Sequence, residues 1–356
     1  MPCFLRGTIY LFPLLLLCTA AMANNALEAF TADFDSSEAP YRCIVSNVSH
    51  PVIQGVSAGF VLRDRIWEKS NGQIYVDFKP LSMLGGEVEV LNLLQMGAIQ
   101  GMGVSSVAAT NLGPRFGVVN LPFLVDSFDK LERFVNSGPL FDHFLRAMEH
   151  QGIIGLDITA YGNYGWASTQ PIQSLAEART MRLRIAEAAV NQLIYREWGL
   201  RPVVMPWPDV PVALRQGVIN SLDHTPTVCN ITRKFEVARH FTEVNYAQGL
   251  FIWIFNKAWL DSLPDDLKVL FQETVREVAS EIRQQAKDQE EDEIRKAKEA
   301  GVTFHRLSDA DMSELRARSV RVHDRYRNQI NRLYRHDEYR PENYLLEMQN
   351  LLDYVP

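Results

Sequence analysis

Two arginines separated by one residue are the first candidates for chemistry in this sequence. Arg182 and Arg184 lie in TMRLRIAEA (residues 180–188), where apolar residues alternate with them. The alternation predicts a short strand, in which residues i and i+2 point to the same face. A guanidinium group can bind a carboxylate through two parallel hydrogen bonds. One of these arginines is therefore a candidate for holding an organic acid; the open alternative is a structural ion pair with a nearby Asp or Glu.

Other polar and aromatic side chains follow the ends of predicted strands. Parallel α/β sheets bind ligands beyond the carboxyl ends of their strands. The residues at these ends and their approaches are Ser105, Asn163, Tyr164, Trp166, Trp207 and His224. A fixed cation with amides, hydroxyls and indoles around it is typical of a site for an organic anion.

The sequence contains no convincing catalytic constellation. GVSAG (residues 55–59) matches the Gly-x-Ser-x-Gly pattern of serine hydrolases, but Ser57 falls inside a predicted helix instead of a strand-to-helix elbow. His143 and His150 have no Cys, Asp or Glu at ligand spacing, so we expect no metal site. GMGVSS (residues 101–106) lacks the full dinucleotide fingerprint, and we expect no cofactor.

Composition predicts an ordinary globular protein that is exported. The 356 residues are 47% hydrophobic and 22% charged with a net charge of −7, which suggests two domains and gives no sign of nucleic-acid binding. Arg6, an apolar run and the ending Ala21-Met22-Ala23 predict a signal peptide over residues 1–23 that is cut after Ala23. The alternatives are an uncleaved anchor, for which the apolar run is short, and a lipoprotein cut before Cys18.

Two cysteines, Cys43 and Cys229, remain after this cleavage. An exported protein can form a disulfide. We expect instead two thiols that never meet.

A strand–helix–strand pattern occurs twice and predicts two similar α/β lobes. The first unit covers residues 73–107 and the second covers residues 201–224. Their helices end alike, in LQMGAI and LRQGVI, and Gly97 and Gly217 fit left-handed helix caps. A strand–helix–strand unit implies parallel pairing through a crossover. A long helix follows over residues 264–300, with Ser262 as its expected cap; a short strand and further helices are expected over residues 302–354.

At these residues the chain resembles the DctP-type solute-binding proteins of TRAP (tripartite ATP-independent periplasmic) transporters. The pieces that carry the resemblance are SMLGGEVEVLNLLQMGAIQGMGVSS, FGVVNLPFLVDS, RLRI, MPWPDVPVALRQGVINSLDHTP and NKAWLDSLPDDLK. It covers nearly all of the chain from about Tyr41 onward. As a set, in this order and spacing, the pieces are specific.

The resemblance implies a fold and its division into parts. The fold is α/β with two periplasmic-binding-protein-like lobes, hinge strands and a long domain-spanning helix. The first lobe is expected over 41–160 plus about 247–285, the second over 161–246 plus about 286–340, and a tail over 341–356. Ligand binds between the lobes, and the lobes close around it.

The resemblance also implies roles for particular residues. The carboxylate-binding arginine of the family falls on Arg184, with Arg182 a supporting or surface residue. An asparagine of the second lobe is replaced by His224, and a common aromatic falls on Trp207. Polar positions of the first lobe fall on Ser105 and Glu87.

One departure bears on the ligand. Many members carry a second arginine in the stretch that corresponds to residues 161–168, where this chain has Asn163, Tyr164 and Trp166. A single arginine beside Trp166 and Trp207 favours a monocarboxylate with an apolar or aromatic body over a dicarboxylate or a sugar acid, because stacking on indole adds about 0.5–1.5 kcal/mol beyond burial.

The leading hypothesis is a monomeric periplasmic receptor that delivers an organic acid to the small and large TRAP membrane subunits. The competing hypotheses are a secreted enzyme that acts on a carboxylate substrate and, as a third, a sensor subunit that uses the same closure. The missing nucleophile–base pair and metal set favour the receptor.

Overall fold

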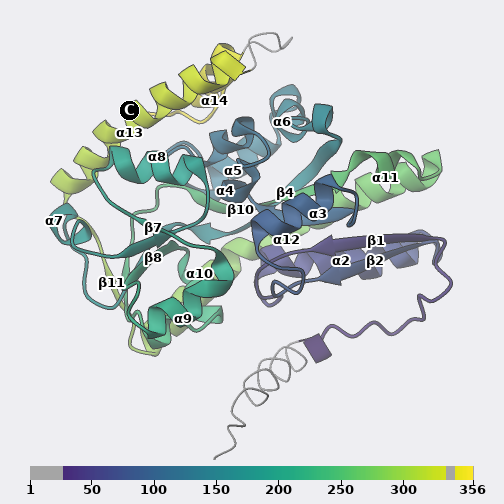
Figure 1. Cartoon of the computed structure of the whole chain (residues 1–356), viewed down its shortest axis with the longest axis horizontal. Coiled ribbons are helices and arrows are strands. Elements are labelled where there is room, and N and C mark those ends of the chain that lie inside the picture. The colour runs from purple at the N-terminus through teal and green to yellow at the C-terminus, as the bar shows by residue number, and fades with distance from the viewer. Residues whose placement is uncertain (1–26, 334–340, 356) are drawn as a thin grey trace, which may run out of the picture. The chain divides into compact units, whose positions relative to one another are not determined.

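A computed structural model describes residues 27–333 and 341–355 of the chain (Figure 1). The predicted signal peptide, residues 1–23, lies outside the described residues. Residues up to Glu38 belong to a unit separate from the one that begins at Ala39. All elements described below belong to the second unit. In the described part of the chain, no helix combines the length and the apolar character that crossing a membrane requires.

The first lobe is built on a five-stranded sheet with the order β2-β1-β3-β10-β4. Strands β1 to β3 are parallel, and β10 pairs antiparallel with both β3 and β4, so β4 runs in the direction of β1 to β3. The strands are β1 (Tyr41–Ser46), β2 (Ile74–Lys79), β3 (Gly101–Ser105), β4 (Ile153–Asn163) and β10 (Gln248–Asn256). The helices of this part are α2 (Gln54–Lys69), α3 (Glu87–Gln95), α4 (Ser106–Ala109), η1 (Pro114–Asn120), α5 (Phe128–Val135), α6 (Pro139–Leu145), η2 (Glu149–Gln151) and α11 (Lys257–Asp261).

The second lobe is built on a six-stranded sheet with the order β11-β9-β5-β8-β6-β7. Its strands are β5 (Gly165–Ser168), β6 (Leu183–Ile185), β7 (Val203–Val204), β8 (Ser221–His224), β9 (His240–Thr242) and β11 (Thr303–His305). Its helices are α7 (Leu175–Ala178), α8 (Ala189–Glu197), η3 (Trp207–Asp209), α9 (Val210–Arg215), α10 (Pro226–Ile231) and η4 (Lys234–Glu236).

Each sheet contains three parallel strands in the same arrangement, which confirms the repeat predicted from the sequence. In the run β1-α2-β2-α3-β3 the first strand lies between the other two, and β6-α8-β7-α9-β8 has the same arrangement. In each predicted strand–helix–strand unit the two strands therefore run parallel to each other. One further strand lies between them, β1 in the first unit and β6 in the second. Gly97 (φ 74°) and Gly217 (φ 70°) have the left-handed backbone that ends each second helix.

The chain passes between the sheets at two crossings that are hydrogen-bonded to each other. One joins β4 to β5 through Tyr164, and the other precedes β10. The Tyr164 N–H donates to the Ala247 carbonyl, and the Asn245 N–H donates to the Tyr164 carbonyl, both at 2.9 Å. Because few residues connect the sheets here, this pair of crossings is the natural hinge.

Helix α12 (Asp265–Glu299) reaches from one lobe to the other, as the resemblance implies. Its 35 residues correspond to about 52 Å, and it packs on α2 and β4 of the first lobe and on α10 of the second. The buried Arg283 anchors it by pairing with Asp157 at 2.7 Å and Glu132 at 2.9 Å. The expected cap was wrong: the N-cap is Pro264 without a side-chain bond, and Ser262 ends the preceding helix.

The C-terminal part consists of β11, α13 (Asp309–Leu333) and α14 (Pro341–Leu351). Helix α13 packs on α8 of the second lobe and on η1 of the first. The buried His323 of α13 makes hydrogen bonds of 3.0 Å with the Pro122 carbonyl and with Gln349 of α14. The residue bounds of the lobes and of the tail stay a prediction.

The two remaining cysteines lie in different lobes. Cys43 is on β1 and Cys229 on α10, and both are buried and free. The prediction that they do not pair is confirmed.

Candidate functional site

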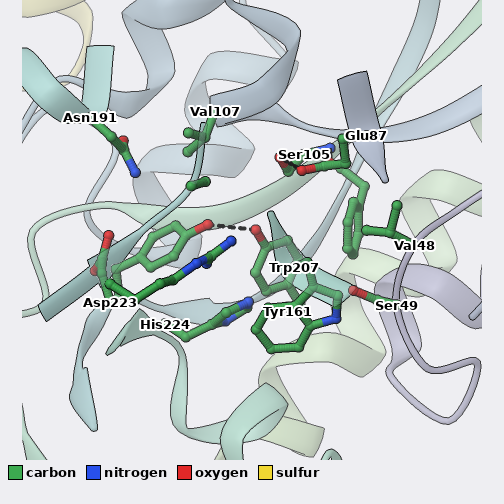
Figure 2. Close-up of a pocket in the computed structure, with 14 residues that line it drawn as sticks. Val48, Ser49, Glu87, Ser105, Val107, Tyr161, Asn191, Trp207, Asp223 and His224 are labelled. Carbon is green, nitrogen blue, oxygen red and sulfur yellow. Dashed lines mark hydrogen bonds between the residues drawn. The ribbon is translucent and has the colours of Figure 1, made fainter. Parts of the chain in front are cut away.

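Residues from both lobes and the hinge line one small cavity (Figure 2). The lining residues are Val48, Ser49, Glu87, Ser105, Val107 and Phe251 from the first lobe, Tyr161 and Tyr164 from the hinge region, and Ala186, Arg184, Asn191, Trp207, Asp223 and His224 from the second lobe. The space open to the centre of a water molecule is about 30 Å³. Polar groups from both lobes border this space.

Arg184 is the cation of this cavity. It lies in the middle of β6 with only 4% of its surface exposed, and its Nε donates to the Met205 carbonyl at 2.9 Å. Within the described chain its terminal nitrogens have no hydrogen-bond partner and it forms no ion pair. Burial lowers the pKa of Arg184, and the charges of Glu87 and Asp223 oppose that shift. No carboxylate among the described residues thus lies within ion-pair distance of Arg184, although the ion-pair alternative requires one.

Arg182 has a different environment, although it is only two residues away. It is exposed at the start of the strand and donates to the carbonyls of Gly217 and Val218 at 2.8 and 3.0 Å. The hydrogen-bond donors of its guanidinium group are therefore occupied by backbone carbonyl oxygens. Of the two arginines, Arg184 is the one that faces the cavity.

Trp207 forms an aromatic wall next to Arg184. The indole centroid lies 5.6 Å from the Arg184 guanidinium carbon and 4.8 Å from the Lys234 ammonium nitrogen, distances typical of cation–π contacts. The His224 ring packs against it at 4.7 Å between centroids (Figure 2). Lys234 is buried behind this wall, and burial lowers its pKa to about 8.

His224 presents a single nitrogen donor. Its Nδ1 accepts the backbone N–H of Thr225 at 2.9 Å, so a neutral ring carries its proton on Nε2. Burial and the nearby positive charges of Arg184 and Lys234 hold the pKa of His224 well below its usual range. The ring can therefore donate to an anion without carrying a charge.

Asp223 lies beside these cations with an unusual proton affinity. Its Oδ2 accepts the Tyr246 hydroxyl at 2.7 Å. Burial raises the pKa of Asp223 to about 7, and hydrogen bonds from Tyr246 and Tyr195 and the charge of Arg184 oppose the rise. Near neutral pH this carboxyl group is consequently present in both protonation states.

The first lobe contributes a second carboxyl group through Glu87, the first residue of α3. Its two oxygens accept the Ser105 N–H at 2.7 Å and the Ser105 hydroxyl at 2.9 Å. Burial raises the pKa of Glu87, although Ser105 and Arg184 favour the charged form. The Ser105 hydroxyl also caps α4 by accepting the Ala108 N–H.

The structure brings six of the eight predicted site residues to the cavity. These are Glu87, Ser105, Tyr164, Arg184, Trp207 and His224. Trp166 is fully buried within the second lobe, where its Nε1 donates to the Tyr195 hydroxyl at 2.8 Å. Asn163 lies at the hinge, where Gln248 donates to its Oδ1 at 2.7 Å. Neither residue lines the cavity. The Trp166 indole packs inside the second lobe, and the Asn163 side-chain oxygen is hydrogen-bonded to Gln248.

Several lining residues were not predicted. Tyr161 is two residues from the predicted Asn163, and its hydroxyl is 2.6 Å from that of Tyr164. Asp223 directly precedes the predicted His224, so the sequence already indicated that Asp223 lies near the site. Asn191 lies on α8 and nothing in the local sequence distinguishes it from a surface amide.

The motifs that resembled enzymes have structural explanations. Ser57 lies within α2, as expected, and its hydroxyl donates to the Gln54 carbonyl. His143 and His150 lie on separate short helices, α6 and η2. The described residues contain no group of His, Cys, Asp or Glu that could hold a metal ion.

The chain matches one protein family over most of its length. The model for "Bacterial extracellular solute-binding protein, family 7" (DctP) matches residues 45–329. A relative, the C4-dicarboxylate-binding periplasmic protein DctP of Rhodobacter capsulatus, is 27% identical over 263 residues, which cover 73% of this chain and 79% of the relative.

Solved structures show the same fold. A TRAP periplasmic solute-binding protein from Desulfovibrio salexigens with bound orotic acid has a TM-score of 0.79 and 17% identity, covering 86% of this chain and 99% of that chain. Another from Shewanella oneidensis, with bound succinate, has a TM-score of 0.79 and 20% identity, covering 87% and 99%. Two lobes of this kind are thus an established architecture.

The raised pKa of Asp223 predicts a pH-dependent stability effect. A folded-state pKa of about 7 against about 3.9 when unfolded means that the folded protein binds more protons between these values. Asp223 therefore lowers the free energy of unfolding increasingly as pH rises through this window. Asp223→Asn should remove this loss, so the difference in unfolding free energy, variant minus parent, should rise between about pH 4 and pH 7.

Urea unfolding of the ligand-free parent and variant at several pH values checks this. The other titrating groups are present in both proteins, so they cancel in the difference. A difference that stays constant from about pH 5 to pH 8 would show that Asp223 titrates as an ordinary aspartate.

Proposed function

The chain belongs to the bacterial extracellular solute-binding proteins of family 7, and from this premise we propose that it is a periplasmic receptor for a monocarboxylate organic acid. The DctP-type resemblance found in the sequence is confirmed by this match. In the proposal, Arg184 holds the ligand carboxylate and the two lobes close around the ligand. The receptor then delivers the acid, unchanged, to the small and large membrane subunits of a TRAP-type transporter.

The observation that carries the proposal is the free guanidinium group of Arg184. It is buried, lines the cavity, and has terminal nitrogens without partners in the described chain. Removing a cation from water is costly unless an anion or hydrogen-bond acceptors compensate it. A ligand carboxylate supplies both in the two-bond geometry that guanidinium prefers. The His224 Nε2 proton can provide a further donor to the same anion.

The charges around the cavity support a single carboxylate on the ligand. Glu87 and Asp223 line the same space as Arg184, and both lower the cost of charging that arginine. A second ligand carboxylate would meet two acidic side chains and one cation. The named relatives bind or contain different acids, among them C4-dicarboxylates and orotic acid, so this chain's own side chains must decide its ligand.

Aromatic and aliphatic side chains support an apolar body on the ligand. Trp166 is not among them, since it lies outside the cavity. Trp207, Tyr161 and Phe251 form the wall instead, with Tyr161 and Phe251 in contact at 4.5 Å between ring centroids. The basis for the apolar preference is therefore Trp207 with residues from the hinge and the first lobe.

Family membership supports a proposal on the location of this protein. We propose that the signal peptide is removed after Ala23 and that the mature receptor is a periplasmic monomer. The lobe bounds given by the resemblance belong to this proposal as well.

A thermal-shift screen tests the ligand class. Aromatic or branched monocarboxylates should raise the melting temperature more than C4-dicarboxylates or sugar acids, since only the former match one cation and an apolar wall. A clear win for succinate, malate or a sialic acid would overturn the preference. Mass spectrometry of the released ligand is the control, because a receptor returns the acid unchanged and the competing secreted enzyme would convert it.

Variants of the two arginines test the site with the best acid from that screen. Losing one partner of a buried charge pair costs about 3–5 kcal/mol, so Arg184→Ala should weaken binding by about a hundredfold or more. Arg184→Lys should also weaken binding, because a point charge cannot reproduce the two-donor fork, but less than alanine does, because lysine keeps the positive charge. Arg182→Ala is the matched control and should bind like the parent, as measured by calorimetric titration.

The structural alternative predicts a different pattern. If Arg184 served only the fold, Arg184→Ala would lower the melting temperature of the ligand-free protein and leave affinity intact. Parental affinity in Arg184→Ala would show that the carboxylate is held elsewhere.

A further inference from the structure

The Glu290 side chain of α12 is packed against the end of β4, where the chain crosses from the first lobe to the second. It is buried, with 8% of its surface exposed, and its Oε1 accepts the Asn163 N–H at 2.5 Å. A Cβ atom on Gly162 would lie 2.5 Å from the same oxygen, which is closer than a Cβ contact allows. Gly162 also has a φ of 109°, in the left-handed region that favours glycine. The crossing therefore leaves room for this carboxylate only because residue 162 has no side chain.

Glu290 also lies where α12 passes from one lobe to the other. Directly before it, Gln289 accepts the backbone N–H of Gln54 at 2.8 Å, at the start of α2 in the first lobe. One turn after it, Glu293 accepts a hydrogen bond from the Asn230 amide at 2.6 Å, on α10 in the second lobe. The bond between Glu290 and the crossing therefore stands between the bonds that the helix makes to each lobe.

The two residues that Glu290 touches separate two tyrosines of the cavity. Tyr161 and Tyr164 line the cavity, and their hydroxyl oxygens are 2.6 Å apart (Figure 2). Gly162 and Asn163 are the residues between them in the sequence. Because the four residues are consecutive, a displacement of the middle two also displaces the tyrosines. Glu290 does not line the cavity itself, so it acts on the site through the crossing.

Glu290 has acidic neighbours and forms no ion pair among the described residues. Burial raises the pKa of Glu290 to about 7; the hydrogen bond from Asn163 opposes the rise, and the charges of Glu291 and Glu243 add to it. The other titratable or charged groups of the elements packed against it are Glu293 with its partner Lys296 on α12, Asp157 of β4 with its partner Arg283, Tyr161 of β4, the buried Cys229 of α10, and Arg306, which pairs with Glu243. Near neutral pH Glu290 is therefore present in both protonation states.

The charge of Glu290 changes the strength of its bond to the crossing. A hydrogen bond to a charged acceptor is shorter than a neutral one and about twice as strong. The charged carboxylate consequently holds the Asn163 N–H more firmly than the protonated form does. A conformation that keeps this bond binds fewer protons than one that has lost it, so it becomes more favourable as pH rises through about 7.

We propose that Glu290 is a positioning residue for ligand binding, whose charged carboxylate holds the crossing in the conformation that brings Tyr161 and Tyr164 to the ligand. This inference rests on the proposed function, because it concerns the affinity of that receptor for its acid. The affinity then depends on pH through a group that lies outside the cavity.

The pH dependence of binding in Glu290→Gln tests the proposal. Glutamine has the shape of the protonated acid and a neutral oxygen acceptor, so the variant lacks the charged form at every pH. With the best acid from the thermal-shift screen, the ratio of dissociation constants, variant over parent, should be about one near pH 6 and about five near pH 9. Calorimetric titration at several pH values measures this ratio. Groups such as Asp223 titrate in both proteins and cancel in it.

Glu291→Gln is the matched control. It removes the same charge from the next residue of α12, whose side chain is exposed, and it should bind like the parent at both ends of the pH range. A Glu290 that served only the fold would change the affinity by the same factor at every pH. A constant ratio from about pH 6 to about pH 9 would therefore overturn the role of Glu290, as would an equal rise in Glu291→Gln.

Amide hydrogen exchange of the ligand-free parent provides a second measurement, which needs neither an acid nor a variant. The Asn163 N–H donates to Glu290, whereas the Tyr164 N–H donates to the Ala247 carbonyl, which does not titrate. The protection of the Asn163 amide relative to that of the Tyr164 amide should be greater at about pH 8 than at about pH 6. Equal relative protection at the two pH values would overturn the inference even if Glu290→Gln does not fold.

The outcomes also separate this inference from the proposed function. An acid that binds through Arg184 with a constant ratio leaves the proposed function intact and removes the role of Glu290. Parental affinity in Arg184→Ala overturns the proposed carboxylate site, and the exchange of the Asn163 amide still decides whether charged Glu290 holds the crossing.

Discussion

A buried guanidinium group without an ion-pair partner among the described residues is the constraint on which this structure depends. Arg184 donates a hydrogen bond to one backbone carbonyl and contacts an indole face, and the charges of Glu87 and Asp223 lie nearby. These contacts offset part of the cost of burying the cation, and its terminal nitrogens remain available. An anion that binds Arg184 would offset the remaining cost of removing this cation from water. In the proposed function, the ligand carboxylate is the partner that this cation lacks among the described residues.

The cation and the opposite wall of the cavity belong to different lobes. Arg184, Trp207, His224 and Asn191 all belong to the second lobe. Glu87, Ser105 and Phe251 belong to the first lobe and complete the cavity from the other side. Two short crossings, joined by hydrogen bonds at Tyr164, connect the sheets, and helix α12 provides a third, longer connection.

The hinge has its own polar network. The Glu290 carboxylate of α12 accepts the Asn163 N–H at 2.5 Å, and Gln248 donates to the Asn163 side chain. Burial raises the pKa of Glu290 to about 7. Asn163 therefore connects the long helix to both crossings, and its place outside the cavity has a structural explanation.

Sequence patterns predicted the parts of this structure that are periodic or specific in order. The repeated strand–helix–strand units, the glycine caps at Gly97 and Gly217, the long helix and the family follow from such patterns, and the structure or the family match confirms them. Strand alternation also separates the two faces of a strand. It does not say which face meets a cavity.

Trp166 and Asn191 show why the remainder could not be predicted. Trp166 lies on β5, a strand between β8 and β9 whose two faces are covered, so its indole is used inside the lobe. Asn191 is separated from Arg184 by a turn into α8, and only the packing of that helix brings its amide to the cavity. Both outcomes depend on how elements that are far apart in the sequence pack together. A single sequence does not reveal that packing.

Closure of two lobes around the ligand is the central claim, and small-angle X-ray scattering measures it directly. A ligand that contacts both lobes shifts the population toward the closed form, because it gains its full set of contacts only there. Saturation of the parent with its tightest-binding acid should reduce the radius of gyration, and the same acid concentration should leave Arg184→Ala unchanged. Identical scattering from the ligand-free and the saturated parent would contradict the claim.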